Sequence, residues 1–156
     1  MKTNRAVDTK LEALREFQLQ YPLSHVGGSI GLLLHGIDLQ RDLTGSDLDI
    51  TTPEFDTSKL AGFDERSDAN DFDVNIKKTH GEAYTKIDIR ITPEPPFTVI
   101  SFDGHLYNVS LLSNIIWWKK KYAEKGVIKH KNDLITIETG VRPIEIKEPE
   151  NDLLPF

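Results

Sequence analysis

Residues 26–50 read VGGSIGLLLHGIDLQRDLTGSDLDI, and this stretch decides how the chain is interpreted. It opens on a glycine pair followed by Ser29 and ends on an alternation in which Leu48 separates Asp47 from Asp49. A glycine-rich turn between a strand and a helix lets backbone amides point at a phosphate, with favourable partial charge from the helix N-terminus. Two aspartates at i and i+2 of a strand project from one face. The stretch therefore predicts a phosphate-binding turn beside paired carboxylates.

A third carboxylate on a neighbouring strand would complete a site for two divalent cations about 3.5–4 Å apart. We expect Asp88 to supply it, because it lies in the middle of the alternating segment 83–92 and faces away from the isoleucines on either side. Asp71 and Asp73 are the alternatives, and they belong to a strand of poorer definition.

Several basic residues are candidates for neutralising phosphate charge. Lys86 and Arg90 share the face of Asp88, and they either contact phosphate or pair with the aspartates. Arg41 either reaches a triphosphate from its loop or is solvated. The three lysines at 119–121 are expected to form a solvated face. Of the adjacent tryptophans at 117 and 118, we expect one to lie in the core and the other to stack on a base or cover a dimer surface.

The remaining elements are predicted from periodicity and turn residues. Expected helices are 8–20 with Asp8 as N-cap, 30–35 with Ser29 as N-cap, and 110–125; expected strands are 23–26, 46–51, 72–76 and 83–92, with a hairpin over 97–109. Residues 54–71 are expected to form a surface loop, 133–139 are either helix or strand, 141–147 are more strand-like, and 148–156 form a tail.

Composition limits the classes of protein to which the chain can belong. The 156 residues carry 19 basic and 25 acidic side chains, a net charge of −6, and no cysteine. One domain is expected, over 1–147. The lack of cysteine excludes disulfides, thiolate zinc sites and a cysteine nucleophile, and it fits a cytoplasmic protein. We expect no membrane span and no signal peptide. The acidic balance argues against generic binding to a nucleic-acid backbone, although a basic strip over 119–131 keeps an RNA acceptor open.

The motifs quoted above resemble the DNA polymerase β-like nucleotidyltransferase superfamily. Its mark is a hydrophobic residue with Gly and Gly or Ser, then Asp–hydrophobic–Asp–hydrophobic, then a strand with a third acid. Here these are residues 26–29, 47–50 and 86–89. The small bacterial branch with antibiotic adenylyltransferases and abortive-infection toxins is the most similar. The resemblance covers residues 23–92 and extends more weakly to 110–125 and 129–134, and the interval between Ser29 and Asp47 is long for the family.

The resemblance implies an α+β fold with a mixed, twisted sheet of about four to five strands flanked by helices. It implies transfer of a nucleoside monophosphate from a nucleoside triphosphate to an acceptor hydroxyl, with release of pyrophosphate. Asp47, Asp49 and Asp88 would bind two Mg²⁺ ions, with Asp88 also a candidate base, and the turn at 27–29 would cradle the triphosphate. Larger relatives add a helical domain that shapes the acceptor pocket; here we expect a second copy or a protein partner to supply that wall.

Two other functions stay open at this point. One is a catalytically inactive nucleotidyltransferase-fold module that binds a nucleotide or a protein, as in a toxin–antitoxin or phage-defence pair. The other is an acidic interaction domain whose carboxylates bind nothing. The sequence does not identify the acceptor or the preferred base.

Overall fold

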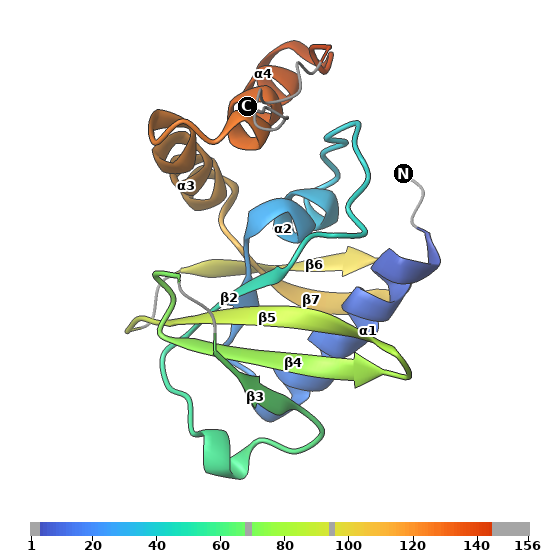
Figure 1. Ribbon diagram of the computed structural model, residues 1–156, viewed down its shortest axis with the longest axis vertical. Coiled ribbons are helices and arrows are strands. Elements are labelled where there is room, and N and C mark those ends of the chain that lie inside the picture. Colours follow the sequence, from blue (N-terminus) through green and yellow to red (C-terminus); the bar gives the residue numbers. More distant parts are fainter. Residues whose placement is uncertain (1–3, 68–69, 94–95, 145–156) are drawn as a thin grey trace, which may run out of the picture.

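Within the residues that the computed structural model describes, 4–67, 70–93 and 96–144, seven strands form one mixed sheet (Figure 1). The strands are β1 (His25–Val26), β2 (Leu48–Thr52), β3 (Asp64–Arg66), β4 (Val74–His80), β5 (Ala83–Ile91), β6 (Phe97–Phe102) and β7 (His105–Ser110). Their order is β3-β4-β5-β2-β1-β7-β6. The pairs β1–β7 and β2–β5 are parallel, and the other neighbours are antiparallel.

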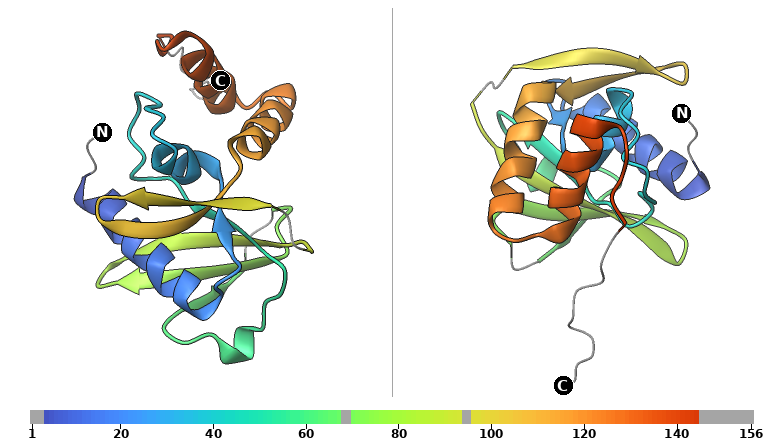
Figure 2. Two further views of the ribbon diagram at one scale, coloured as in Figure 1. Left: turned by 180° about the vertical axis from the view of Figure 1, so that it is seen from behind. Right: turned by 90° about the horizontal axis from the view of Figure 1, so that it is seen from above.

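Helices cover the sheet from two sides. They are α1 (Arg5–Gln20), α2 (Gly28–Leu34), α3 (Leu112–Glu124) and α4 (Ile128–Thr139), with a short 3₁₀ turn, η1 (Thr57–Lys59). Helix α1 crosses the rear of the sheet in Figure 1 and the front in the reversed view of Figure 2. Helices α3 and α4 form a hairpin that stands away from α1, with α2 between the hairpin and the strands.

The apolar core lies on one face of strands β2 and β5, and the aspartates of these strands point to the other face. Leu48 lies opposite Ile87, and Ile50 opposite Ile89, on the parallel strands β2 and β5. All four side chains are essentially inaccessible and belong to the same apolar cluster as the inner face of α1. Because side chains alternate across a strand, the residues between them turn to the other face. This places Asp49 on the side of the sheet away from the core.

The sequence expectation of an α+β fold with a mixed sheet is confirmed, but the expected count of four to five strands is wrong. The strand β3 was missed because Asp64, Glu65 and Arg66 show no apolar alternation; they pair with β4 at the exposed edge of the sheet. The hairpin over 97–109 is confirmed, with Asp103 and Gly104 both at positive φ in its turn. Since β7 pairs with β1, both hairpin strands join the central sheet.

Local boundaries also differ from expectation. Helix α1 begins before Asp8, because the side chain of Asn4 accepts a hydrogen bond from the Val7 amide at 2.9 Å and acts as the N-cap. Gly27, not Ser29, precedes α2. The ambiguous segment 133–139 belongs to helix α4, which ends at Gly140 in a left-handed conformation. The strand expected over 141–147 is not formed by its described part, and 145–156 lies outside the described residues.

Candidate active site

The glycine turn between β1 and α2 lies directly against Asp49. Gly28 has φ +61°, and a Cβ atom built on it would stand 2.6 Å from the Asp49 Oδ2 atom. The Gly27 amide donates to the Asp49 carbonyl oxygen at 2.8 Å. Only glycine combines this backbone conformation with so close an approach. The structure therefore brings together the turn and the carboxylate that the sequence places 21 positions apart.

Asp49 and Asp88 are register partners on β2 and β5. Burial is the largest cause that raises the pKa of Asp49 to about 7, and the negative charges of Asp88 and Asp47 contribute to the rise. The pKa of Asp47 is also raised, first by burial and then by Asp88. The three predicted carboxylates thus repel one another, which means that they share one region of the sheet.

The alternatives to Asp88, which are Asp71 and Asp73, precede strand β4. Asp71 is half exposed and stands 3.9 Å from Arg90, and the carboxylate of Asp73 accepts a hydrogen bond from the Ile91 amide at 2.7 Å. Of the three, Asp88 is the register partner of Asp49.

Asp88 already has two partners inside the protein. Its Oδ1 atom accepts a hydrogen bond from Arg66 Nη2 at 2.6 Å and another from Asn75 Nδ2 at 2.8 Å. Arg66 comes from β3, the strand that the sequence did not reveal. Among the described residues, no group of three or more His, Asp or Glu side chains stands ready to hold a metal ion. The two-magnesium site remains a prediction.

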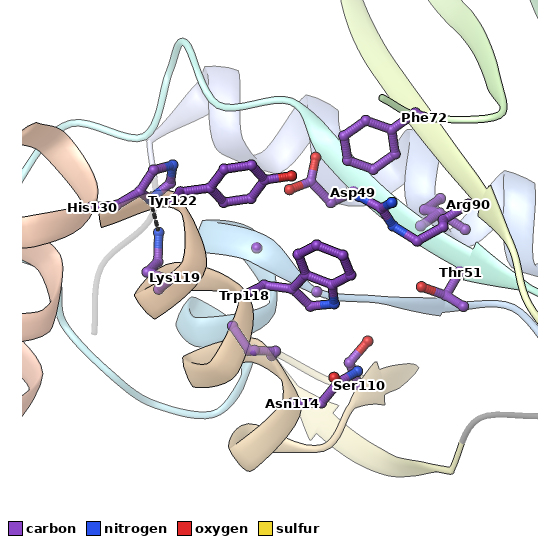
Figure 3. A pocket seen from close by; sticks show the side chains of 14 residues that line it. Asp49, Thr51, Phe72, Arg90, Ser110, Asn114, Trp118, Lys119, Tyr122 and His130 are labelled. Atoms are coloured by element: carbon purple, nitrogen blue, oxygen red, sulfur yellow. Dashed lines mark hydrogen bonds between the residues drawn. The ribbon is translucent and has the colours of Figure 1, made fainter. Parts of the chain in front are cut away.

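A pocket with a cavity volume of about 50 Å³ opens beside Asp49, between the sheet and the α3–α4 hairpin (Figure 3). Thr51 and Arg90 line it from the sheet, and Trp118, Tyr122 and others line it from α3. The guanidinium of Arg90 lies 4.4 Å from the ring centre of Phe72 and 4.2 Å from that of Trp118, so it is clamped between two aromatic faces. Aromatic rings, the Arg90 guanidinium and the Asp49 carboxylate therefore line the same pocket.

The other end of the pocket is basic, and here the sequence interpretation was incomplete. Lys119 was expected on a solvated face, yet it is 2% exposed and its Nζ atom donates to Ser29 Oγ at 3.1 Å and to Asp133 Oδ2 at 2.8 Å. The helical period does indicate that Lys119 points inward, because it follows the buried Ile115 by four positions and so lies on the same face of α3. Burial lowers the pKa of Lys119.

Asp133 anchors this basic cluster from α4. It is fully buried and accepts hydrogen bonds from Arg41, Lys119 and Arg142 at 2.7 to 2.9 Å. Burial alone would raise the pKa of Asp133, but the hydrogen bonds from Arg41 and the charge of Lys119 hold it well below its ordinary value. Three cations therefore converge on this one carboxylate, and one of them, Lys119, lines the pocket.

Two further predicted residues are thereby located. The Arg41 side chain is directed inward, where its Nη2 atom donates to Ser29 Oγ at 2.7 Å in addition to its pairing with Asp133. Lys86 lies opposite Lys77 in the β4–β5 register, and its positive charge opposes the rise in the pKa of Asp47.

The neighbouring His130 lines the pocket and lies 3.1 Å, through Nδ1, from Lys119 Nζ. Burial and the charges of Lys119 and Lys129 lower the pKa of His130 to about 4. It is therefore neutral near pH 7, so Nδ1 accepts the hydrogen bond from the lysine.

Comparisons of the chain with protein-family models, with curated proteins and with solved structures find no match. Among the described residues, none of the helices combines the length and the apolar composition that a bilayer crossing requires.

Proposed function

We propose that this chain is a nucleotidyltransferase that moves a nucleoside monophosphate from a nucleoside triphosphate to an acceptor hydroxyl. The observation that carries the proposal is the juxtaposition of the Gly27–Gly28 turn with Asp49, which is itself in register with Asp88. Gly27, Gly28 and Asp49 lie at the wall of a pocket that is also lined by Lys119. This arrangement offers separate places for a triphosphate, a carboxylate centre and an acceptor.

The predicted ligands are of the type that magnesium prefers, although their side chains are not gathered into a metal-binding group in the described residues. Three carboxylates supply hard oxygen ligands. The raised pKa of Asp49 reflects its burial first and then the negative charges of Asp88 and Asp47. Asp47, Asp49 and the Oδ2 atom of Asp88 would hold the ions, since both recorded contacts of Asp88 fall on Oδ1. When bound, the ions would acidify an attacking hydroxyl and neutralise charge on the leaving pyrophosphate.

The chain's own groups provide the rest of the chemistry. Lys119 and the neighbouring cations place positive charge at the end of the pocket, where phosphate oxygens would be stabilised. The hydroxyl of Ser29 is occupied by Arg41 and Lys119, so the turn contributes to phosphate binding through its backbone rather than through this side chain. Asp88 is also the candidate base for the acceptor's proton.

The test is a transfer assay with each of the four ribonucleoside triphosphates, Mg²⁺ and a panel of hydroxyl acceptors, scored by pyrophosphate release and product mass. Asp49→Asn should abolish the product. Asp71→Asn is the matched control, because it removes the same charge from a half-exposed position near the pocket and should retain activity. Equal activity of wild type and Asp49→Asn would overturn the proposal.

The ion pair between Arg66 and Asp88 favours a second candidate, a catalytically silent module of the same fold. In that case the guanidinium stands where a cation would otherwise act, and the pocket binds a nucleotide without turnover. A thermal shift with triphosphate and Mg²⁺, together with no product from any acceptor, would support this second function.

A further inference from the structure

Ser110 is a buried polar residue that lines the pocket from the sheet (Figure 3). It is the last residue of β7, and its carbonyl oxygen accepts a hydrogen bond from His35 Nε2 at 2.8 Å. The preceding residue, Val109, lies in the core and pairs with Val26 of the parallel strand β1. Because side chains alternate along a strand, the Ser110 hydroxyl points to the other face of the sheet, which is the face of Asp49.

The Ser110 hydroxyl is held by His25, which is completely buried. Nδ1 of His25 lies 2.7 Å from Ser110 Oγ. The imidazole stacks on the ring of Phe97, with ring centres 5.3 Å apart and planes 24° apart, and Phe97 is itself the register partner of Ser110. The orientation of the imidazole is therefore fixed by its neighbours. Within the part of the chain that the structure describes, the second ring nitrogen, Nε2, has no hydrogen-bond partner.

This unpartnered nitrogen indicates where the ring proton lies. Burial lowers the pKa of His25 to about 4, so the ring is neutral near pH 7 and carries one proton, on Nδ1 or on Nε2. A proton on Nε2 would leave a buried N–H donor without an acceptor among the described residues, and such orphaned donors are rarer in proteins than unsatisfied acceptors. A proton on Nδ1 is used in the contact with Ser110. His25 therefore donates, and the serine oxygen accepts.

A hydroxyl that accepts a hydrogen bond still has its own proton to donate. Across residues 4–67, 70–93 and 96–144, Ser110 Oγ has no hydrogen-bond partner other than His25. The oxygen also lies against the glycine turn, since a Cβ atom built on Gly27 would stand 3.3 Å from it. The Ser110 proton is thus free to bind an oxygen atom of a ligand that lies in the pocket beside this turn.

We propose that Ser110 donates a hydrogen bond to a phosphate oxygen of the nucleoside triphosphate, and that His25 is the positioning residue that keeps this hydroxyl a donor. The inference rests on the proposed function and adds a side-chain donor to its triphosphate site. A phosphate oxygen is favoured over a neutral oxygen because Lys119 and Arg90 line the same pocket. A hydrogen bond to a charged oxygen is also about twice as strong as one to a neutral oxygen.

The position of the ring proton is tested on the wild-type protein, by long-range ¹H–¹⁵N NMR correlation of the histidine rings near pH 7. The His25 signals are assigned by their loss in His25→Asn. We expect a protonated Nδ1 and an unprotonated Nε2. A proton on Nε2 overturns the proposal, because Nδ1 would then take the Ser110 proton and leave none for a ligand.

The phosphate contact is tested by isothermal titration calorimetry with Mg²⁺ and three kinds of ligand: the ribonucleoside triphosphates, inorganic triphosphate and the nucleosides. Ser110→Ala should weaken binding of both phosphate ligands at least about tenfold and leave nucleoside binding unchanged. Ser113→Ala is the matched control, since it removes the same hydroxyl from an exposed position outside the pocket and should bind like wild type. Unchanged phosphate affinity in Ser110→Ala, or no phosphate binding by wild type, overturns the proposal. So does weaker nucleoside binding, which would assign the serine to the sugar or the base.

The positioning role is tested with a pair of variants that both lose the stack on Phe97. His25→Asn places an amide N–H donor near the position of Nδ1 and should keep triphosphate affinity close to that of wild type. His25→Leu offers no donor and should weaken binding as much as Ser110→Ala, with no further loss when the two substitutions are combined. Equal weakening in His25→Asn and His25→Leu overturns the positioning role, because it would trace the effect to the lost stack.

The transfer assay separates this inference from the proposed function. Ser110→Ala should raise the KM for the triphosphate about tenfold, since a contact with the bound nucleotide is lost. Transfer with wild-type kinetics in Ser110→Ala overturns the inference and leaves the proposed function standing. Triphosphate binding that depends on Ser110, without transfer to any acceptor, overturns the proposed function and leaves the phosphate contact standing.

Discussion

Asp49 and Asp88 are direct neighbours on the parallel strands β2 and β5, and neither carboxylate is freely solvated. Parallel pairing sets their spacing, and the glycine turn closes over one of them. Two like charges so placed oppose each other, and the protein tolerates this because the apolar residues that follow them, Ile50 and Ile89, pack the same two strands into the core.

The first prediction concerns pH. The folded-state pKa of Asp49, about 7, lies above the ordinary value of 3.8. The folded state therefore holds the proton more tightly, and this group's contribution to stability is full below about pH 4 and declines as the pH rises towards 7. Each pKa unit corresponds to about 1.4 kcal/mol. In EDTA, Asp49→Asn should match wild type at pH 4 and exceed it by a few kcal/mol at pH 8.

Urea unfolding at several pH values measures this difference. Asp71→Asn serves as control because Asp71 is half exposed and should follow wild type throughout. A difference between Asp49→Asn and wild type that stays constant from pH 4 to pH 8 would show that Asp49 titrates normally in the folded protein.

The second prediction concerns Gly28. Gly28→Ala forces a side chain into a left-handed conformation, which costs about 1–2 kcal/mol, and also drives Cβ against Asp49 Oδ2. Gly36→Ala provides the matched comparison, since Gly36 has φ +83° but nothing within 4 Å of the added atom. We expect Gly28→Ala to lose more stability than Gly36→Ala and to lose transferase activity, whereas Gly36→Ala keeps it. Equal losses of stability and intact activity would contradict the close approach.

The third prediction concerns the buried anion of α4. Asp133→Asn leaves the cations of Arg41, Lys119 and Arg142 without their shared counter-charge. Removing one partner of a buried ion pair costs about 3–5 kcal/mol, and we expect a loss of free energy of unfolding in that range. Glu138→Gln, at an exposed position on the same helix, should change it by less than about 0.5 kcal/mol. A similar effect of both substitutions in urea unfolding would show that the cluster is not a structural anchor.

The sequence revealed the local parts of this fold and missed those that depend on distant partners. The alternation around Asp49 and Asp88, the glycine turn and the Asp103–Gly104 hairpin are short-range patterns, and each is present in the structure. The strand β3 carries no such pattern, because three charged residues form it by pairing with β4 at the edge.

The candidate site shows the same limit. Lys119 and Asp133 lie 14 residues apart on two helices, and their contact depends on how those helices pack. The one indication in the sequence that the lysine points inward is the four-residue spacing between Ile115 and Lys119, which places both on one face of α3. The partner of Asp88 was not predictable either, since Arg66 reaches it from an element that local pattern did not reveal.

The last prediction uses that partner to decide between the active and the silent function. Arg66 and Asp88 form a nearly buried ion pair, with side chains 9% and 6% exposed. Arg66→Met leaves Asp88 uncompensated, which should cost about 3–5 kcal/mol in EDTA. If Asp88 belongs to a cation site, Mg²⁺ should recover part of this loss, and the Mg²⁺-induced rise in melting temperature should be larger in Arg66→Met than in wild type. The double variant Arg66→Met with Asp88→Asn should lose that extra response, because the carboxylate that attracts the ion is gone. An equal response to Mg²⁺ in wild type, single and double variants would remove Asp88 from any metal site and leave its ion pair with Arg66 as a purely structural contact.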